Sequence, residues 1–432
     1  MQREEILRRA AEMLDQEVPG LDRDLLRNHV RRFLDRRDVY LSAREEKGSP
    51  LYLFDERALV KAAEEFRGTF QAAIPDVSCF YAIKSNYHSF FLGTLARLGY
   101  GLDVSSGDEL MRAVEFGPTA VIFSGPGKTP AELAAACSVS GRVTVLIDSF
   151  GELDRLQAAA EAAAVNVTAG VRVSVEDRGL WRKFGIPVSR LQEFLRRAAK
   201  CSRVRVEGIQ YHTSWNLDTA SHERFLNKLG GHLQALTTAE REVLHFLDIG
   251  GGFWPAEGEW LHAAVTPSGQ LRHFVDPGIL PGSDHRCSRA LTIHDFAQGI
   301  RSALERDIYP YWKPQIYLEP GRWICHSAMH ILLTVVDKKS PDLVITDGGT
   351  NSVGWERYEH DYFPVINLSR PSLREKSCLI CGALCTPHDL WGYHYFGEDI
   401  EAGDVLLIPD QGAYTYSLRQ QFIKSLPGEA VI

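Results

Sequence analysis

The chain has 432 residues, of which 44% are hydrophobic and 24% are charged. At roughly 100 to 200 residues per domain, this length predicts two or three domains around a large core. The average composition and the lack of any run of about 18 apolar residues exclude a disordered chain, a fibrous protein and a membrane span. Its 48 Lys and Arg against 56 Asp and Glu leave a net charge of -8 with no long basic block, so nucleic acid is not an expected partner.

The N-terminal segment is charged and lacks the apolar stretch of a signal peptide, so we expect a cytoplasmic protein whose eight cysteines are thiols. In residues 1–46, apolar residues recur at helical spacing among many Arg, Glu and Asp. This pattern predicts a helical arm on the surface. The sequence Gly48-Ser49-Pro50 then marks a break.

Residues 47–325 alternate between short apolar or β-branched runs and segments rich in Ala and Leu, which is typical of repeated strand-helix units. Eight such units over about 250 residues predict a (β/α)8 barrel, with a doubly wound open sheet as the alternative. The predicted strands are 79–84, 100–105, 120–125, 143–148, 167–173, 206–212, 245–250 and 315–320.

After about residue 326 the helical segments become rare, and short apolar runs follow one another with Gly, Pro and Asp between them. Residues 326–432 are therefore predicted to form a mostly antiparallel C-terminal β domain, a β-barrel. Residues near 50–56 are expected to pack with it.

Reactive residue types stand at the ends of several predicted barrel strands, where such barrels place their active sites. Lys84 ends the first strand. A lysine that loses hydration there has a lowered pKa, and its neutral amine can attack a carbonyl. The alternative is a lysine whose amine extends out to solvent.

The glycines 250–252 follow the seventh strand, and Arg322 follows the eighth. Glycine lets backbone N-H groups approach a phosphate, although three glycines alone are also typical of a tight turn. His212 and Glu319 end the sixth and eighth strands; the alternatives are a structural histidine and an ion-pair partner of Arg322. Together, an amine, an imidazole, a carboxylate, a guanidinium and glycines on one rim suit a carbonyl cofactor that bears a phosphate, such as pyridoxal phosphate.

Several motifs occur in one order from about residue 50 to the C-terminus: Tyr81-Ala82-Ile83-Lys84 with Asn86, Leu102-Asp103-Val104-Ser105-Ser106, Phe123-Ser124-Gly125-Pro126-Gly127-Lys128, Lys183-Phe184-Gly185, Asp248-Ile249-Gly250-Gly251-Gly252-Phe253, Glu319-Pro320-Gly321-Arg322, Cys385 with Asp389, and Gly412-Ala413-Tyr414-Thr415. On these residues the chain resembles the fold-type III pyridoxal-phosphate decarboxylases, the group that contains ornithine, diaminopimelate and carboxynorspermidine decarboxylases. The resemblance implies an alanine-racemase-like barrel followed by a β domain, and it leaves out the arm before residue 46.

The resemblance also implies the roles of the site residues. Lys84 would hold pyridoxal phosphate as a Schiff base, with Asp103 nearby, and His212 would stack on the pyridine ring. Glu319 would keep the ring nitrogen protonated, which makes the ring a strong electron sink and favours decarboxylation over racemisation. The remaining cofactor contacts would come from Ser214, Gly251, Gly252, Gly321, Arg322 and Tyr414.

In the family, the equivalents of Cys385 and Asp389 come from a second subunit, and the cysteine helps to protonate the product. The resemblance therefore implies a homodimer with shared active sites. One departure from the family pattern is at Ser214, which is displaced by one position while Trp215 occupies the usual place of the serine. This puts the phosphate contact of Ser214 in doubt.

The residue after Cys385 is an acid in the ornithine and diaminopimelate enzymes, where it reads the distal amine of the substrate. Here it is Thr386, so a simple diamino acid is a less suitable substrate. The pattern is similar to that of members that act on conjugated or carrier-protein-linked amino acids in siderophore, antibiotic or polyamine-type pathways. Arg357 and Arg370 are candidates to meet a carboxylate of a larger substrate; the alternative is that both are solvated surface arginines.

A zinc site made by the thiols of Cys378, Cys381 and Cys385 with His388 is an alternative for that region. The sequence around them has strand composition, which points neighbouring ligands to opposite faces, so no metal is expected.

Two further functions stay open, an amino-acid racemase on the same fold and a non-catalytic homologue that binds a partner protein. The presence of Lys84, Glu319 and Cys385 argues against the second.

Overall fold

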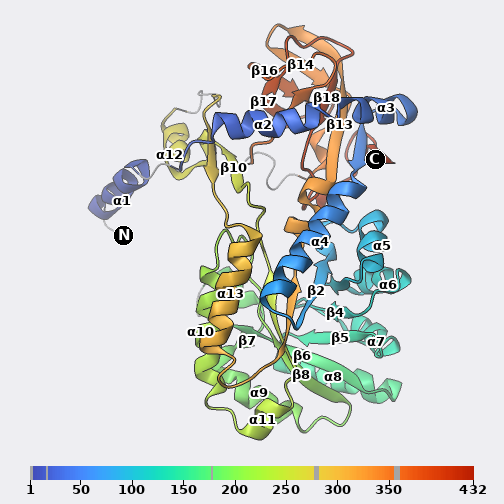
Figure 1. Ribbon diagram of the computed structural model, residues 1–432, viewed down its shortest axis with the longest axis vertical. Coiled ribbons are helices and arrows are strands. Elements are labelled where there is room, and N and C mark those ends of the chain that lie inside the picture. The colour runs from blue at the N-terminus through green and yellow to red at the C-terminus, as the bar shows by residue number, and fades with distance from the viewer. Residues whose placement is uncertain (1–2, 16–17, 177–178, 277–281, 355–360) are drawn as a thin grey trace. The chain divides into compact units, whose positions relative to one another are not determined.

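The computed structural model describes residues 3–15, 18–176, 179–276, 282–354 and 361–432 (Figure 1). The chain forms two compact units. The barrel unit comprises Leu59–Ala256 and Leu291–Cys325, and the β unit comprises Met1–Ala58, Glu257–Ala290 and His326–Ile432. Among the described helices, none has the length and apolar character needed to cross a membrane.

Eight parallel strands form the centre of the barrel unit, in the order β5-β4-β3-β2-β12-β9-β8-β6. Because β5 also pairs with β6, the sheet closes on itself, which confirms the (β/α)8 barrel and removes the open-sheet alternative. Each strand overlaps one of the eight predicted. Their bounds are β2 (Val77–Ala82), β3 (Gly101–Val104), β4 (Val121–Phe123), β5 (Val143–Ile147), β6 (Val167–Ser174), β8 (Val204–Gln210), β9 (Phe246–Gly251) and β12 (Gln315–Glu319), and the two-residue β7 (Ile186–Pro187) adds to β6.

Amphipathic helices separate these strands, and side-chain caps fix where several of them begin. At α7, Thr129 and Glu132 form a reciprocal capping box, and Pro130 takes the first helical position. At α8, the Ser149 hydroxyl accepts a hydrogen bond from the Glu152 N-H. The helices are α4 (Glu56–Ala73), α5 (Ser89–Arg97), α6 (Gly107–Glu115), α7 (Pro130–Ser138), α8 (Phe150–Ala163), α9 (Leu191–Ala198), α10 (Ala220–Leu233), α11 (Thr238–Glu242), α13 (Ile293–Asp307) and α14 (Arg322–Cys325).

The barrel interior is a packed core. A layer of Phe80, Ile122, Leu146 and Phe246 comes from four different strands. A Cβ atom added at Gly208 would lie 2.3 Å from the ring of Phe246, so only glycine leaves room for that ring. The layer blocks the interior and leaves the strand ends to carry the site.

The β unit is a mixed sheet in the order β14-β16-β17-β15-β18-β13-β1-β19. Because β14 pairs with both β16 and β13, six of the strands close into a barrel, as predicted, but the β1–β19, β14–β16 and β15–β17 pairs are parallel. The bounds are β1 (Leu51–Phe54), β13 (Met329–Ser340), β14 (Leu343–Thr346), β15 (Ile366–Asn367), β16 (Glu375–Cys381), β17 (Leu390–Phe396), β18 (Val405–Ile408) and β19 (Gly428–Val431). Segment 50–56, expected to pack here, supplies β1.

The N-terminal segment folds as three helices, α1 (Arg3–Asp15), α2 (Arg23–Leu34) and α3 (Arg37–Lys47). Only α1 has the character of a surface arm, since none of its residues is buried. From α2 and α3, Val30 and Tyr40 enter the same core as Leu332 and Leu407 of the β unit. The apolar face of these two helices therefore belongs to a domain core.

Residues 257–290, which the linear division placed in the barrel domain, belong to the β unit. They contain a hairpin of β10 (Glu259–His262) and β11 (His285–Ser288), and α12 (Pro267–Val275) lies between its strands. Trp260 and Cys287 of the hairpin pack in the β-unit core. In the sequence this segment lies between two barrel strands, β9 and β12. The order of the strands along the chain therefore does not reveal that the segment leaves the barrel unit and joins the β unit.

Candidate active site

Lys84 lies in η1 (Ile83–Ser85), directly after β2, and its amine is held by a buried carboxylate. The β2–β3 register pairs Ala82 with Asp103, which places Asp103 beside the end of β2. The Nζ atom of Lys84 donates to Oδ2 of Asp103 at 2.7 Å, and Ser124 donates to Oδ1 at 2.8 Å. Burial raises the pKa of Asp103, and the ammonium of Lys84 opposes that rise. The Lys84 side chain stays 32% exposed, although its amine donates to Asp103.

Glu319 ends β12 and is held from two sides. Gln210 Nε2 donates to Oε1 at 3.0 Å, and Nδ1 of His212 lies 2.7 Å from Oε2. Burial works to raise the pKa of Glu319, but His212 and Lys84 outweigh it, and the net pKa is well below the usual range. Burial lowers the pKa of His212, so a neutral ring with its proton on Nδ1 can donate to an ionised Glu319.

Two charged residues without a role in the sequence prediction lie in the same part of the barrel. Asp248 in β9 is fully buried and accepts a hydrogen bond from the Gly250 N-H at 2.8 Å. Burial and the charge of Glu319 raise the pKa of Asp248 well above the usual range. Arg172 in β6 is buried with its guanidinium carbon 4.3 Å from the centroid of the Phe184 ring. A charged residue inside an otherwise apolar strand was the signal that could have identified both.

The predicted glycine turn brings backbone segments too close for side chains. Gly250 and Gly252 have φ angles of 72° and 78°, in the left-handed region. A Cβ atom at Gly251 would lie 2.0 Å from the carbonyl oxygen of Glu319, and one at Gly321 would lie 2.0 Å from Oγ of Ser85. The turn and the end of β12 therefore form one glycine-lined surface beside Glu319. Next in the chain, the Arg322 guanidinium carbon lies 4.2 Å from the centroid of the Trp254 ring.

Trp215, which stands where the family has its serine, has a left-handed backbone conformation. Its φ angle is 58°, and its side chain is exposed. Asn216 then turns back to the glycine turn, where its Nδ2 donates to the Gly251 carbonyl at 2.8 Å. A Cβ atom on Gly252 would lie 2.8 Å from Cα of Ser214. Ser214 therefore lies against Gly252 in spite of its displacement in the sequence.

The remaining predicted residues belong to the β unit. On the loop between β16 and β17, Cys385 is exposed and Thr386 is half-buried. Asp389 is buried on that loop, and each of its oxygens accepts hydrogen bonds: Oδ1 from the Thr350 N-H at 2.7 Å and Oδ2 from the Leu384 N-H at 2.6 Å. Asp389 thus fixes the shape of the loop that carries Cys385.

Tyr414 follows β18 in a left-handed backbone conformation with a φ angle of 59°. Of the two arginines considered for a substrate carboxylate, Arg370 has its Nε 3.3 Å from Oδ1 of Asp404 and is partly exposed. Arg357 lies outside the described residues. Arg370 thus pairs with a buried carboxylate of its own unit.

Residues 59–326 match the family model described as the pyridoxal binding domain of pyridoxal-dependent decarboxylases. The chain belongs to this family. The decarboxylase is therefore a carboxy-lyase that uses pyridoxal phosphate and acts on amino acids.

Full-length relatives agree with this assignment. The decarboxylase is 28% identical over 408 residues to a diaminopimelate decarboxylase of Pseudomonas fluorescens, covering 89% of this chain and 88% of that one. It is 25% identical over 351 residues to a lysine/ornithine decarboxylase of Selenomonas ruminantium, covering 79% and 80%. The fold resembles the crystal structure of diaminopimelate decarboxylase from M. jannaschii in co-complex with L-lysine, with a TM-score of 0.74 at 22% identity over 91% and 89% of the two chains.

The residues at the rim of the decarboxylase fit the cofactor chemically. Lys84 provides an accessible amine for a carbonyl carbon, and the ionised Glu319 provides an acceptor for a protonated ring nitrogen. The N-H groups of Gly250 and Gly251 already donate to Asp248 and His212. Gly252 and Gly321 have no side chain, and glycine lets a backbone N-H group approach a phosphate. An amine, an anion and a phosphate cradle on one rim are the groups that pyridoxal phosphate needs.

Proposed function

We propose that this decarboxylase removes the α-carboxylate of an amino acid whose side chain is conjugated, to give an amine and carbon dioxide, in a specialised biosynthetic pathway. The observation that carries the proposal is the loop between β16 and β17, which carries Cys385. Its acid, Asp389, is buried and hydrogen-bonded through both oxygens. The position after Cys385 is the neutral and half-buried Thr386.

A free diamino acid ends in an ammonium group that needs an anion to replace its hydration. On this loop, Thr386 offers only a hydroxyl, to which the His388 N-H lies at 3.4 Å. An amide-linked or carrier-linked side chain has no such ammonium and needs only hydrogen-bonding groups. The loop therefore favours a conjugate over lysine, ornithine or diaminopimelate.

We also propose the roles of the rim residues. Bound pyridoxal phosphate supplies an electron sink for the electron pair that remains when carbon dioxide leaves. Lys84 would bind its carbonyl carbon, and Asp103 would orient the amine at 2.7 Å. Glu319 would hold a proton on the ring nitrogen. The partly buried ring of His212 would lie against the cofactor and position Glu319 through its 2.7 Å contact.

The phosphate would be held by the glycine-lined surface, namely Gly251, Gly252 and Gly321, with Ser214, Arg322 and Tyr414. Ser214 fits this role because its backbone lies against Gly252. Arg322 would add a permanent positive charge to neutral N-H donors. After decarboxylation, Cys385 would return a proton to the α-carbon.

The active form would be a homodimer in which each site uses Lys84 of one chain and Cys385 of the other. A complementation assay tests this sharing, with Lys84→Ala and Cys385→Ala chains mixed after reversible dissociation. Random pairing would then restore roughly a quarter of wild-type activity, because half of the dimers are mixed and each mixed dimer keeps one intact site. If the mixture stays as inactive as its parents, each site is built within one chain and the shared arrangement is wrong.

The substrate proposal is tested by measuring carbon dioxide release from ornithine, lysine and meso-diaminopimelate beside their distal N-acyl derivatives and γ-amides of glutamate. We expect kcat/KM to be at least about tenfold higher for a conjugate, which corresponds to roughly 1.4 kcal/mol of discrimination. Thr386→Asp should shift the preference towards ornithine or lysine, whereas Thr386→Val, which adds no charge, should not. Efficient decarboxylation of a free diamino acid by the wild type would overturn the conjugate proposal and leave the reaction class intact.

A further inference from the structure

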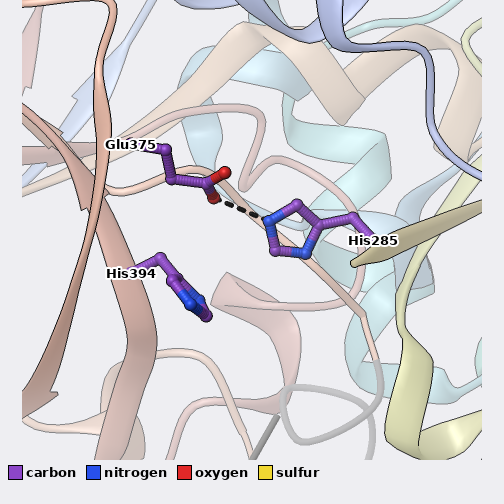
Figure 2. Close-up of side chains that lie close together, drawn as sticks. All are labelled: His285, Glu375 and His394. Atoms are coloured by element: carbon purple, nitrogen blue, oxygen red, sulfur yellow. Dashed lines mark hydrogen bonds and ion pairs between the residues drawn. The ribbon is translucent and has the colours of Figure 1, made fainter. Parts of the chain in front are cut away.

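A second group of polar side chains is buried in the β unit, outside every residue assigned to the cofactor. His285 comes from β11, Glu375 begins β16, and His394 lies in β17 (Figure 2). One possible ligand atom from each residue lies within 4.8 Å of the other two. His285 and Glu375 are already in contact, with Nε2 at 2.6 Å from Oε1.

The geometry of the sheet explains how two of the three residues meet. The β16–β17 register pairs Ser377 with His394 and Glu375 with Phe396. Alternate residues of a strand share one face, so Glu375 lies on the same face as Ser377 and is a diagonal neighbour of His394. His285 reaches this face from the β10–β11 hairpin, 90 residues before Glu375. The group is therefore assembled by tertiary structure from two separate parts of the chain.

The group is buried and has hydrogen-bonding capacity that the described residues do not use. His285 and His394 are 5% and 7% exposed. Nδ1 of each ring is buried without a hydrogen-bond partner in the described part of the chain, and the same holds for Nδ1 of the neighbouring His262. Burial of imidazole nitrogens without partners costs free energy, which a bound cation would offset.

A fourth residue, Tyr362, holds two of the candidate ligands in place. The hydroxyl of Tyr362 donates to Oε1 of Glu375 at 3.0 Å. Its ring also stacks on His285, with centroids 3.5 Å apart and an angle of 16° between the planes. Ligands of protein-bound metals are usually oriented by hydrogen bonds and packing of this kind.

We propose that His285, Glu375 and His394 bind a divalent transition metal, with zinc as the occupant. Two imidazoles and one carboxylate form a ligand set that zinc accepts, and a fourth tetrahedral position is left for water. Around zinc, ligand atoms lie roughly 3.3 to 3.5 Å apart, given bonds of about 2.0 to 2.2 Å. This separation lies between the 2.6 Å of the His285–Glu375 contact and the 4.8 Å limit of the group, so side-chain rotations suffice.

The bound metal would fasten the β10–β11 hairpin to strands β16 and β17. The hairpin is an excursion from between two barrel strands, and its Trp260 and Cys287 pack in the β-unit core. A metal that bridges His285 to the two strands would restrain this excursion. This restraint is independent of the proposed substrate.

The test uses the full-length protein, stripped with EDTA, reloaded with zinc chloride and freed of excess metal by gel filtration. Zinc per chain is then measured by mass spectrometry for the wild type, Glu375→Gln, His394→Ala and the control His388→Ala. Glu375→Gln keeps an oxygen for Tyr362 and removes only the charge, so it remains informative if His394→Ala does not fold. His388 belongs to the cysteine-rich alternative and lies outside the proposed site.

We expect about one zinc per chain in the wild type and the His388 variant, and loss of that zinc in both site variants. Zinc should raise the Tm of the wild type by at least about 3 °C and leave that of Glu375→Gln unchanged. Cobalt in place of zinc should give a visible spectrum without a thiolate charge-transfer band. A wild type that retains no zinc, site variants that retain as much as the wild type, or a thiolate band would each overturn the proposal.

Discussion

Glu319 in the barrel unit and Glu375 in the β unit each contact a histidine, at 2.7 and 2.6 Å; His212 is partly buried and His285 is buried. Their surroundings differ. The electrostatic environment of Glu319 includes Lys84 and the buried carboxyl of Asp248. Glu375 receives a hydrogen bond from Tyr362 and lies within reach of a second imidazole, His394. A carboxylate–imidazole pair therefore suits a reactive site when a lysine such as Lys84 lies beside it. The same pair suits a metal site when a further neutral ligand such as His394 lies beside it.

The largest expected effect is on the barrel side of this comparison. Lys84→Ala should lower kcat roughly 10³-fold or more, because no other group replaces an amine that both binds the cofactor and moves protons. The visible absorbance band of lysine-bound pyridoxal phosphate should be present in the wild type and absent in the variant. A wild type without this band, or a variant that keeps it, would show that Lys84 does not hold the cofactor.

Matched substitutions at the two carboxylates test the comparison directly. Glu319→Gln should reduce kcat on the order of 10²-fold, since a neutral amide cannot stabilise a proton on the ring nitrogen as an anion does. Glu375→Gln, measured with the same substrate, should keep kcat within about twofold of the wild type. Equal losses in the two variants would mean that the β-unit group also takes part in the reaction.

The loop that carries Cys385 is held by Asp389, a buried carboxylate of the same unit. Asp389→Asn should lower the free energy of unfolding by about 1 to 3 kcal/mol, because an amide cannot accept hydrogen bonds with both of its polar atoms. Urea denaturation measures the loss. The control is Asp337→Asn, whose side chain is 60% exposed and which should change stability by less than about 0.5 kcal/mol. Equal effects would remove the structural role of Asp389.

The smallest effect concerns acid stability in the barrel unit. Burial lowers the pKa of His222 to about 4 from its ordinary 6.5. Between these values the unfolded chain binds more protons, so stability rises with pH and is lost as pH falls from 6.5 towards 4, by about 1.4 kcal/mol per pH unit. His222→Phe should reduce this slope in urea titrations, whereas a substitution of the exposed His245 by Gln should not. An unchanged slope in His222→Phe would assign the acid sensitivity to other groups.

Much of the barrel unit was predictable, because its signals are local and its topology is regular. Each strand is a short apolar run, and parallel closure brings the ends of all eight strands to one rim. Lys84 and Glu319 could therefore be assigned to the same site from strands far apart in the sequence. Arg172 and Asp248 were given no role, although a charge inside an apolar strand was visible at each.

The β unit was predicted only in outline. Short strands indicated a β-barrel, but neither the parallel pairs nor the packing of Tyr40 and Trp260 in its core follows from local pattern. Asp389 was assigned to the substrate from the resemblance, and its hydrogen bonds to Thr350 and Leu384 appear only in the folded chain. The zinc alternative that was weighed used cysteines close together in the sequence, whereas the group that the fold assembles contains no cysteine.

The sequence by itself determined the family, the barrel and the order of the reactive residues along the rim. Local hydrophobic periodicity and residue type predict the strands and the residues at their ends. Closure of the parallel barrel then brings those strand ends close together. Only the tertiary structure decided that residues 257–290 leave the barrel and that His285 meets Glu375 and His394. Contacts between an excursion and a distant sheet depend on the packing of both cores, and no short segment of sequence encodes that packing.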